Sequence, residues 1–291
     1  MSLEDIRALC ARFAEGDALR DAGLETPEEI ERFDNIPYRA GSVWGLLDVY
    51  RRKDAPAVQP VLVNVHGGGY VYGTKETYQF YGMGMALRGF TVVNFNYRLA
   101  PEHRYPCALE DVNAVMHWVC SHAGEYGFDV NNVFMVGDSA GAALLSEYTA
   151  FWASGDYRAL FGWELPSFRL GAVALNCGFY CISDDFRPDS EAVASYYGSD
   201  PLALHGDRLR LHRFIDANYP PTYVMTCEED FLRACAEPMA ALLRSRGVKV
   251  ESALYTGSEK PLGHVFHIDQ KSNDAARCND AEAAFLKQYM I

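Results

Sequence analysis

Residues 133–145 read VFMVGDSAGAALL, and this stretch decides the fold. Val133–Val136 is a short apolar run typical of a strand, and residues 142–152 follow a helical pattern. Between them lies G-x-S-x-G, the pattern in which a serine occupies a sharp turn from a strand into a helix. We therefore expect Ser139 to lie exposed at the carboxyl edge of a sheet, with Asp138 supporting the turn.

The same alternation of strand and helix continues along the chain on both sides of this turn. Strands that alternate with helices of about 10–15 residues indicate βαβ units, and continuous apolar strands indicate a sheet covered on both faces. We predict an α/β fold with a mostly parallel central sheet and helices on both faces. The expected strands lie at 61–65, 90–95, 133–136, 170–175, 222–226 and 248–254, and the expected helices at 79–88, 109–119, 142–152, 232–246 and 281–290.

Two segments interrupt this alternation. Residues 1–35 form a helical, charged N-terminal segment, and residues from about 180 to 218 are irregular and rich in Asp, Ser, Tyr and His. Long insertions on an α/β core often become a lid over a binding cleft, although a surface excursion without function is the alternative. We predict a single domain over 1–291, with a small helical cap formed by these two segments.

The composition is that of an ordinary globular protein. The 291 residues are 49% hydrophobic, and 26 basic against 39 acidic residues give a net charge of −13. Because an acidic surface repels phosphate backbones and anionic headgroups, we expect no nucleic-acid or membrane partner. No run reaches the roughly 18–20 apolar residues of a membrane helix, and the N-terminus lacks a signal-peptide core. Together with eight scattered cysteines, this favours reduced thiols and a cytoplasmic location.

A second motif, His66-Gly67-Gly68-Gly69, directly follows the expected strand at 61–65. Consecutive glycines allow backbone N–H groups to point into a cavity, where they stabilise the negative charge that develops on a carbonyl oxygen under attack. We expect Gly67 and Gly68, together with Ala140 after the serine, to donate to this oxygen. The spacing fits neither a dinucleotide-binding loop nor a P-loop. His66 is expected to anchor the loop rather than to carry protons.

A serine nucleophile needs a general base, and the base needs an acid that orients it. In this architecture the chain order is serine, acid, histidine. Acids follow the strand at 222–226 and histidines follow the strand at 248–254, so both sets are expected near the serine. The candidate acids are Glu228, Glu229 and Asp230, of which we favour Asp230, and the candidate bases are His264 and His267, of which we favour His264.

Other groups of residues give weaker indications. The histidines of His264-x-x-His267 have the spacing of a metal-binding pair, but a loop pair without a third ligand is weak evidence for zinc. No metal ion and no organic cofactor is therefore expected. Four aromatic residues are candidates for lining an acyl pocket: Tyr70, Tyr72, Tyr196 and Tyr197.

Taken together, these motifs resemble the hormone-sensitive-lipase-like branch of the α/β-hydrolases, the bacterial carboxylesterases related to acetyl esterases. The resemblance covers roughly residues 45–290. It implies that Asp230, before an apolar-Leu pair, and His264, before a short-residue-Phe step, belong to the catalytic triad. Arg98, in the stretch 96–112, is expected to pair with an acid such as Glu102 or Asp111. The stretches that carry the resemblance are HGGGYVYG (66–73), NYRLAPEHRYPCALEDV (96–112), VFMVGDSAGAALL (133–145) and PPTYVMTCEEDFLRACAEPMAALLRSRGV (220–248).

The chain departs from the family pattern at Ala142 and Val265, where glycine is common, and in its short N-terminal cap. None of these departures removes a catalytic atom. The resemblance implies an α/β-hydrolase fold and a serine carboxylesterase that hydrolyses short-chain acyl esters through an acyl-enzyme. An amide or formamide hydrolase on the same triad is one alternative, and a non-catalytic ligand-binding homologue is another. The expected partner is a small acyl ester, and a homodimer is left open.

Overall fold

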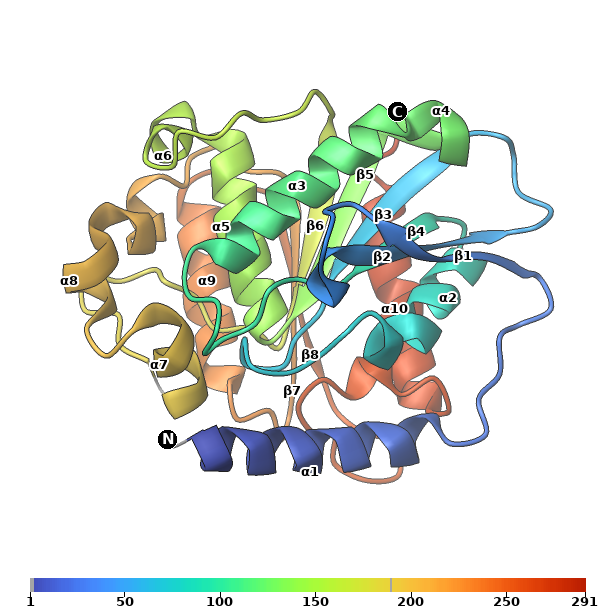
Figure 1. Cartoon of the computed structure of the whole chain (residues 1–291), viewed down its shortest axis with the longest axis horizontal. Coiled ribbons are helices and arrows are strands. Elements are labelled where there is room, and N and C mark those ends of the chain that lie inside the picture. Colours follow the sequence, from blue (N-terminus) through green and yellow to red (C-terminus); the bar gives the residue numbers. More distant parts are fainter. Residues whose placement is uncertain (1–2, 189) are drawn as a thin grey trace.

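One eight-stranded sheet runs through the computed structural model, which describes residues 3–188 and 190–291 (Figure 1). Met1, Ser2 and Asp189, which belong to the two predicted cap segments, lie outside the described residues. The strand order is β1-β2-β4-β3-β5-β6-β7-β8. The strands from β4 to β8 in this order pair in parallel, whereas β1 and β2 are antiparallel to their neighbours. The strands are β1 (Ile30–Pro37), β2 (Leu46–Arg52), β3 (Gln59–Val65), β4 (Thr91–Phe95), β5 (Phe128–Asp138), β6 (Leu170–Asn176), β7 (Thr222–Cys227) and β8 (Val250–Tyr255).

The central strands are buried on both faces, as their continuous apolar sequences predict. All residues of β4, β6 and β7 are buried, whereas the edge strands β1 and β8 are mostly exposed or half-buried. The mostly parallel sheet is therefore confirmed. The helical prediction for residues 1–35 is wrong from residue 30 onward, because β1 begins there. Its charged, half-exposed sequence IERFDNIP hides the strand, since an edge strand buries little apolar surface.

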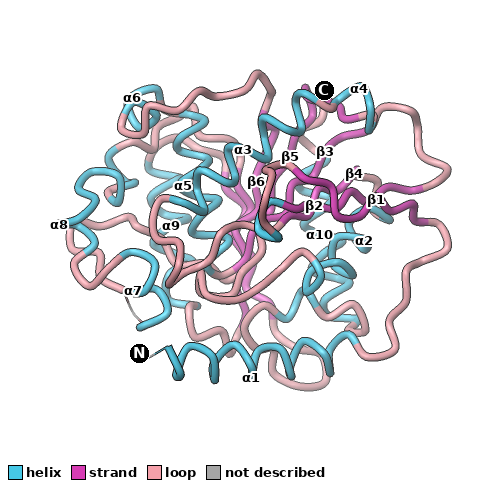
Figure 2. Tube along the Cα trace, in the orientation of Figure 1, coloured by secondary structure: helices cyan, strands magenta, loops and turns pink. Residues whose placement is uncertain are grey.

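Helices cover both faces of the sheet, as predicted (Figure 2). α3, α5 and α9 pack on one face and α2 and α10 on the other, so that two hydrophobic clusters are separated by the sheet. α10 begins eight residues earlier than the sequence predicts, at Asn273 rather than residue 281. These helices are α2 (Gln79–Leu87), α3 (Cys107–Ser121), α5 (Ala140–Ala153), α9 (Arg233–Ser245) and α10 (Asn273–Lys287), with the short α4 (Ala123–Tyr126) and α6 (Gly155–Ala159) between them.

Among their described residues, the predicted cap segments contain three α-helices: α1 (Leu3–Asp21), α7 (Glu191–Tyr197) and α8 (Pro201–His205). α1 extends along the bottom of the molecule in Figure 1. The Tyr72 hydroxyl donates to Asp17 of α1 over 2.7 Å, and Arg20 of α1 donates to the Thr77 carbonyl over 2.7 Å. A few polar contacts thus attach α1 to the loops that follow β3.

Arg98 forms the ion pair that the sequence predicts. Its guanidinium contacts Asp111 over 2.9 Å and Glu110 over 2.5 Å, both on α3, whereas the alternative partner Glu102 is not involved. The pair joins the loop after β4 to α3, which supports an architectural role for this motif.

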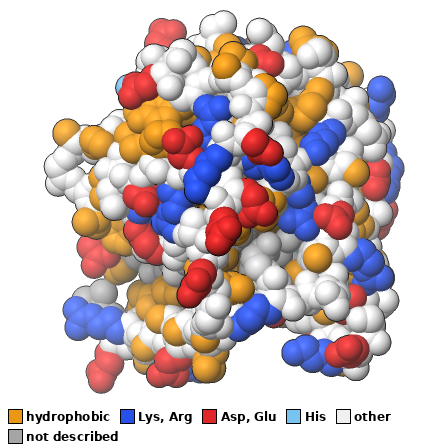
Figure 3. Space-filling model, turned by 90° about the vertical axis from the view of Figure 1, so that its right-hand side faces the viewer, with side chains coloured by type: hydrophobic (Ala, Val, Ile, Leu, Met, Phe, Trp, Pro, Cys, Tyr) orange, Lys and Arg blue, Asp and Glu red, His pale blue; other side chains and the backbone are white. Residues whose placement is uncertain are grey.

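On the face seen in Figure 3, basic side chains lie among acidic ones, so the net charge does not produce a purely acidic surface there. Within 3–188 and 190–291, no helix combines the length and the apolar character needed to cross a membrane.

Candidate active site

Ser139 occupies a sharp turn between β5 and α5, where the sequence predicts it. Its backbone has φ 52° and ψ −120°, a conformation that non-glycine residues rarely adopt and that the surrounding structure must hold. A Cβ at Gly141 would lie 2.1 Å from the Val65 carbonyl oxygen, which explains why only glycine fits there. Ser139 is half-buried, while the preceding β5 residues and the following first turns of α5 are buried. The turn therefore presents the serine to the cavity described below.

The glycine loop after β3 lies beside this turn. His66 is fully buried, stacks on Tyr97 with ring centroids 4.1 Å apart, and has its Nδ1 2.8 Å from the Gly67 carbonyl oxygen. Burial lowers the pKa of His66 to about 4, so that its imidazole is neutral near pH 7. The buried, stacked ring agrees with the anchoring role that the sequence predicts for this histidine.

The backbone amides of the loop differ from the prediction at Gly67. The Gly67 N–H, which the sequence predicts as an oxyanion donor, instead donates to the Tyr78 hydroxyl over 3.1 Å in this structure. The N–H groups of Gly68, Gly69 and Ala140 form no hydrogen bond with another backbone carbonyl of the described chain. Gly68 has φ 113°, and a Cβ there would lie 2.2 Å from the Tyr72 carbonyl oxygen. Glycine is therefore required at this position.

Asp138 lies behind the loop, directly before the serine. Its Oδ2 accepts a hydrogen bond of 2.7 Å from the Tyr78 hydroxyl, which in turn accepts from the Gly67 amide. Burial, only partly offset by the hydrogen bond from Tyr78, raises the pKa of Asp138 to about 7. Tyr78 thus joins the glycine loop to the serine turn, a contact that no local sequence pattern indicated.

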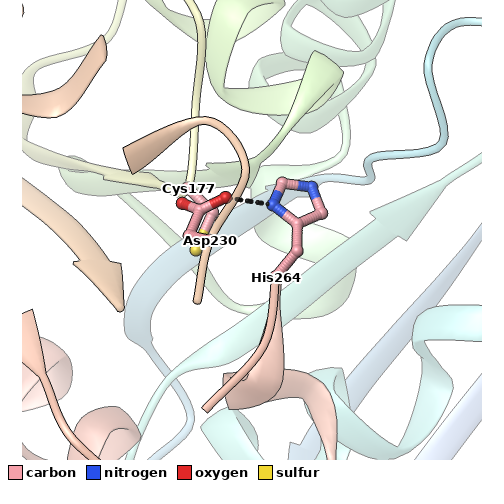
Figure 4. A group of neighbouring side chains, drawn as sticks. All are labelled: Cys177, Asp230 and His264. Carbon is pink, nitrogen blue, oxygen red and sulfur yellow. Dashed lines mark hydrogen bonds and ion pairs between the residues drawn. The ribbon is translucent and has the colours of Figure 1, made fainter. Parts of the chain in front are cut away.

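Asp230 and His264 form a hydrogen-bonded pair at the carboxyl ends of β7 and β8 (Figure 4). The His264 Nδ1 lies 2.6 Å from Asp230 Oδ1. Two further donors hold the carboxylate: the Thr226 hydroxyl at 2.7 Å and the Leu232 amide at 2.9 Å. Burial opposes the charged form, but the hydrogen bond and charge of His264 outweigh it, and the pKa of Asp230 lies below its usual value.

The competing candidates are placed differently. Glu229 is exposed, and Glu228 accepts hydrogen bonds from the amides of Gly257 and Leu262, which hold the loop after β8. His267 is 1% exposed, packs edge-on against Tyr81, and burial lowers its pKa to about 3. Of the two histidines, His264 alone is paired with Asp230 among the described residues.

The loop that carries His264 is tightly held. The Cys227 thiol donates to the Gly263 carbonyl over 3.0 Å, and Val265 has φ 54°. A β-branched residue is strained in this left-handed region, which gives a physical reason for the glycine that is common at this position in the family. The departure at Val265 therefore affects the backbone next to the histidine, not its imidazole.

Among the described residues, one group could hold a metal ion: Cys177, Asp230 and His264, whose donor atoms lie within 4.8 Å of one another (Figure 4). In this structure the carboxylate and the imidazole are bonded to each other, and the Cys177 thiol is buried. Hydrogen bonding with Cys227 and burial raise the pKa of this thiol well above its usual value. The donors thus fit an acid–base pair with a thiol behind it better than a metal site.

The serine turn, the glycine loop and His264 all border one cavity of about 620 Å³. Ser139, His264 and the three glycines of the loop line it, and most of the remaining lining is apolar. α1 and α7 contribute lining residues from the cap, and Phe231, which is 74% exposed, packs on the His264 ring with centroids 4.2 Å apart. A cavity of this size suits a small organic ligand.

The sequence predicts that four tyrosines line an acyl pocket, and one of them, Tyr72, lines the cavity. Tyr70, Tyr196 and Tyr197 are instead buried in a separate aromatic cluster, where Tyr70 stacks on Tyr196 with centroids 4.1 Å apart. The prediction is wrong for these three. Side chains two positions apart, such as those of Tyr70 and Tyr72, share a face in a regular strand, but these residues lie in a turn.

The chain is similar in sequence to known proteins of one fold family. The model of a family described as having the alpha/beta hydrolase fold matches residues 62–268. Carboxylesterase NlhH from Mycobacterium tuberculosis is 31% identical over 78% of this chain and 75% of its own length. The acetyl esterase of Salmonella choleraesuis is 38% identical over 76% of this chain and 70% of its own length.

Among solved structures, esterase B from Lactobacillus rhamnosis, inhibited by a tributyrin phosphonate, superposes with a TM-score of 0.86. It is 25% identical in sequence, and the alignment covers 98% of this chain and 96% of the other. The likeness therefore extends over the cap as well as the sheet.

Proposed function

The chain belongs to the α/β-hydrolase family and is a carboxylic ester hydrolase, and we propose that it cleaves short-chain acyl esters through a Ser139–His264–Asp230 triad. The observation that carries this proposal is the bonded Asp230–His264 pair, of which His264 lines the same cavity as a serine on a strained turn. Short acyl groups are proposed because one relative is an acetyl esterase and another is inhibited by a tributyrin phosphonate.

The mechanism follows from the positions of these groups. Asp230 accepts a hydrogen bond from the Nδ1–H of His264, which leaves Nε2 unprotonated as the base that takes the Ser139 hydroxyl proton while Oγ attacks the ester carbonyl. Asp230 also stabilises the imidazolium that forms, consistent with its lowered pKa. The alcohol leaves with the proton from His264, and water then attacks the acyl-enzyme by the same base.

The developing oxyanion is proposed to be held by the N–H groups of Gly68, Gly69 and Ala140. These amides are not bonded to another backbone carbonyl of the described chain, whereas that of Gly67 is engaged by Tyr78. The helix that begins at Ala140 adds the partial positive charge of its N-terminus at the same point. Preformed donors of this kind contribute a few kcal/mol to transition-state stabilisation.

The proposal is tested with p-nitrophenyl esters from acetate to decanoate and with an amide matched to the best ester. We expect turnover to be highest for the shorter acyl chains and the ester to be preferred over the amide. Ser139→Ala should abolish hydrolysis while the circular dichroism spectrum stays that of the wild type. Retained turnover in this variant would refute the triad, and a preference for decanoate would refute the short-chain assignment.

A further inference from the structure

The face of α1 that lines the cavity has an unusual composition. Five residues at helical spacing contribute to the lining, which means that one stripe of the helix forms the cavity wall. An apolar cavity would be expected to select apolar residues on this stripe. The stripe instead carries an arginine at its centre: Leu9, Arg12, Phe13, Gly16 and Asp17.

Arg12 is exposed to solvent as well as to the cavity, and no ion pair or hydrogen bond of its side chain is found among the described residues. The acid on the same stripe is already used, because Asp17 binds Arg20 over 2.7 Å and the Tyr72 hydroxyl over 2.7 Å. Asp138, the other carboxyl group of the lining, is buried and bonded to a tyrosine hydroxyl. Within the described lining Arg12 is the only Lys or Arg, and its five N–H donors are available to a ligand.

The surroundings of Arg12 suit a ligand that is apolar along its length and charged at one end. Phe13 of α1 and Val193 of α7 line the cavity from the cap, and Phe231 packs on the ring of His264. A Cβ at Gly16, one turn from Arg12, would meet no atom within 4 Å, so this position of the stripe leaves open space.

We propose that Arg12 determines specificity by binding a free carboxylate on the ester substrate, at the end remote from the scissile bond. The inference rests on the proposed function and adds a substrate class to it: esters that carry one carboxylate. One guanidinium matches one carboxylate through two parallel N–H···O bonds. A phosphate group carries nearly two charges, and the described lining offers no second Lys or Arg to balance the second charge.

The whole chain carries a charge of −13, which opposes the approach of an anion. A local cation at the cavity therefore has a larger effect on an anionic substrate than on a neutral one. The carboxylate can belong to the acyl part or to the alcohol part of the ester, and the test has one arm for each.

The test compares kcat/KM for matched anionic and neutral esters. Monomethyl adipate and methyl hexanoate place the carboxylate on the acyl side, and acetoxyhexanoate and hexyl acetate place it on the alcohol side. The anionic-to-neutral ratio is measured for the wild type, Arg12→Gln, Arg12→Lys and Arg7→Gln. Arg7 is a matched control, because it is an exposed arginine of α1 that does not line the cavity.

We expect Arg12→Gln to lower the ratio about tenfold in one arm, since a charged hydrogen bond is lost. Arg12→Lys should restore most of it, and Arg7→Gln should keep the wild-type ratio. An unchanged ratio in Arg12→Gln, or an equal fall in Arg7→Gln, would overturn the inference while leaving the proposed function intact. If the wild type hydrolysed neither the neutral nor the anionic esters, both proposals would fall.

Discussion

The floor and the roof of the cavity are built in opposite ways. The floor consists of the loops that follow β3, β5, β7 and β8, and it carries the glycine loop, Ser139, Asp230 and His264. Its key groups are buried or half-buried, and several are hydrogen-bonded or held in a strained backbone conformation. The roof consists of α1 and α7, and α1 is largely exposed and attached by a few side-chain contacts.

This difference separates chemistry from selectivity. Catalytic groups must be held within fractions of an ångström, which requires the dense bonding found in the floor. A surface that selects substrates needs shape and charge rather than such fixed geometry. Changes in the floor should therefore reduce turnover by orders of magnitude, whereas changes in the roof should shift substrate preference or KM.

The largest effect is expected at His264, and His267 provides the comparison three residues away. His264→Ala should lower kcat by about 10³-fold or more, because the base is lost. His267→Ala should lower the free energy of unfolding by about 2 kcal/mol, since a buried ring is removed, but keep most of the turnover per folded molecule. Steady-state kinetics with a short p-nitrophenyl ester and denaturant unfolding measure the two. Comparable kcat losses in both variants would contradict the assignment.

Asp230→Asn should lower kcat on the order of 10²- to 10³-fold, because an amide neither holds His264 in the Nδ1–H tautomer nor stabilises the imidazolium by its charge. Glu229→Gln is the control, since this neighbouring acid is exposed and contacts neither the serine nor the histidine through its side chain in any described bond. A loss of kcat in Glu229→Gln as large as that in Asp230→Asn would contradict the assignment of Asp230.

Glu147 lies on α5, the helix that follows the serine turn, where this helix contacts α7 of the roof. Its Oε1 accepts a 2.6 Å hydrogen bond from Tyr197, its Oε2 has no partner among the described atoms, and burial raises its pKa to about 8. Because the unfolded chain loses this proton near pH 4.5 and the folded chain only near 8, stability falls as pH rises between them.

Glu147→Gln removes this titration, so its free energy of unfolding relative to the wild type should increase by about 1–3 kcal/mol from pH 5 to pH 8. Urea unfolding at the two pH values measures the difference, with Glu164→Gln as an exposed control. A difference that stays constant with pH would show that the buried carboxyl group does not titrate in this range.

The smallest effect is expected in the roof. Tyr72→Phe removes the hydrogen bond to Asp17 that attaches α1, and we expect KM for a neutral ester to rise roughly threefold with little change in kcat. Tyr126→Phe, on the distant α4, should change neither constant. A fall in kcat at unchanged KM would mean that α1 takes part in the chemistry rather than in binding.

The sequence predicts the floor far better than the roof, for a physical reason. The serine turn, the glycine loop and the acid and histidine positions each follow a strand, and the carboxyl ends of parallel strands meet at one edge. Contacts made across loops leave no such periodic signal. Tyr78, which engages the Gly67 amide and Asp138, was missed for this reason, as was Thr226 behind Asp230.

The roof shows the same limit. The sequence marks the segments at 1–35 and 180–218 as interruptions of the core, but neither the strand β1 nor the buried tyrosine cluster follows from a local pattern. The stripe of α1 that faces the cavity could be read from helical spacing once its orientation is known. Only the packed structure provides that orientation.

Covalent labelling with a fluorophosphonate, followed by peptide mapping, tests the central claim most directly. We expect one adduct, on Ser139, that forms in step with the loss of ester hydrolysis and is abolished in Ser139→Ala and strongly slowed in His264→Ala. Complete inactivation with the adduct on another residue, or labelling of Ser139 at the wild-type rate in His264→Ala, would contradict the account.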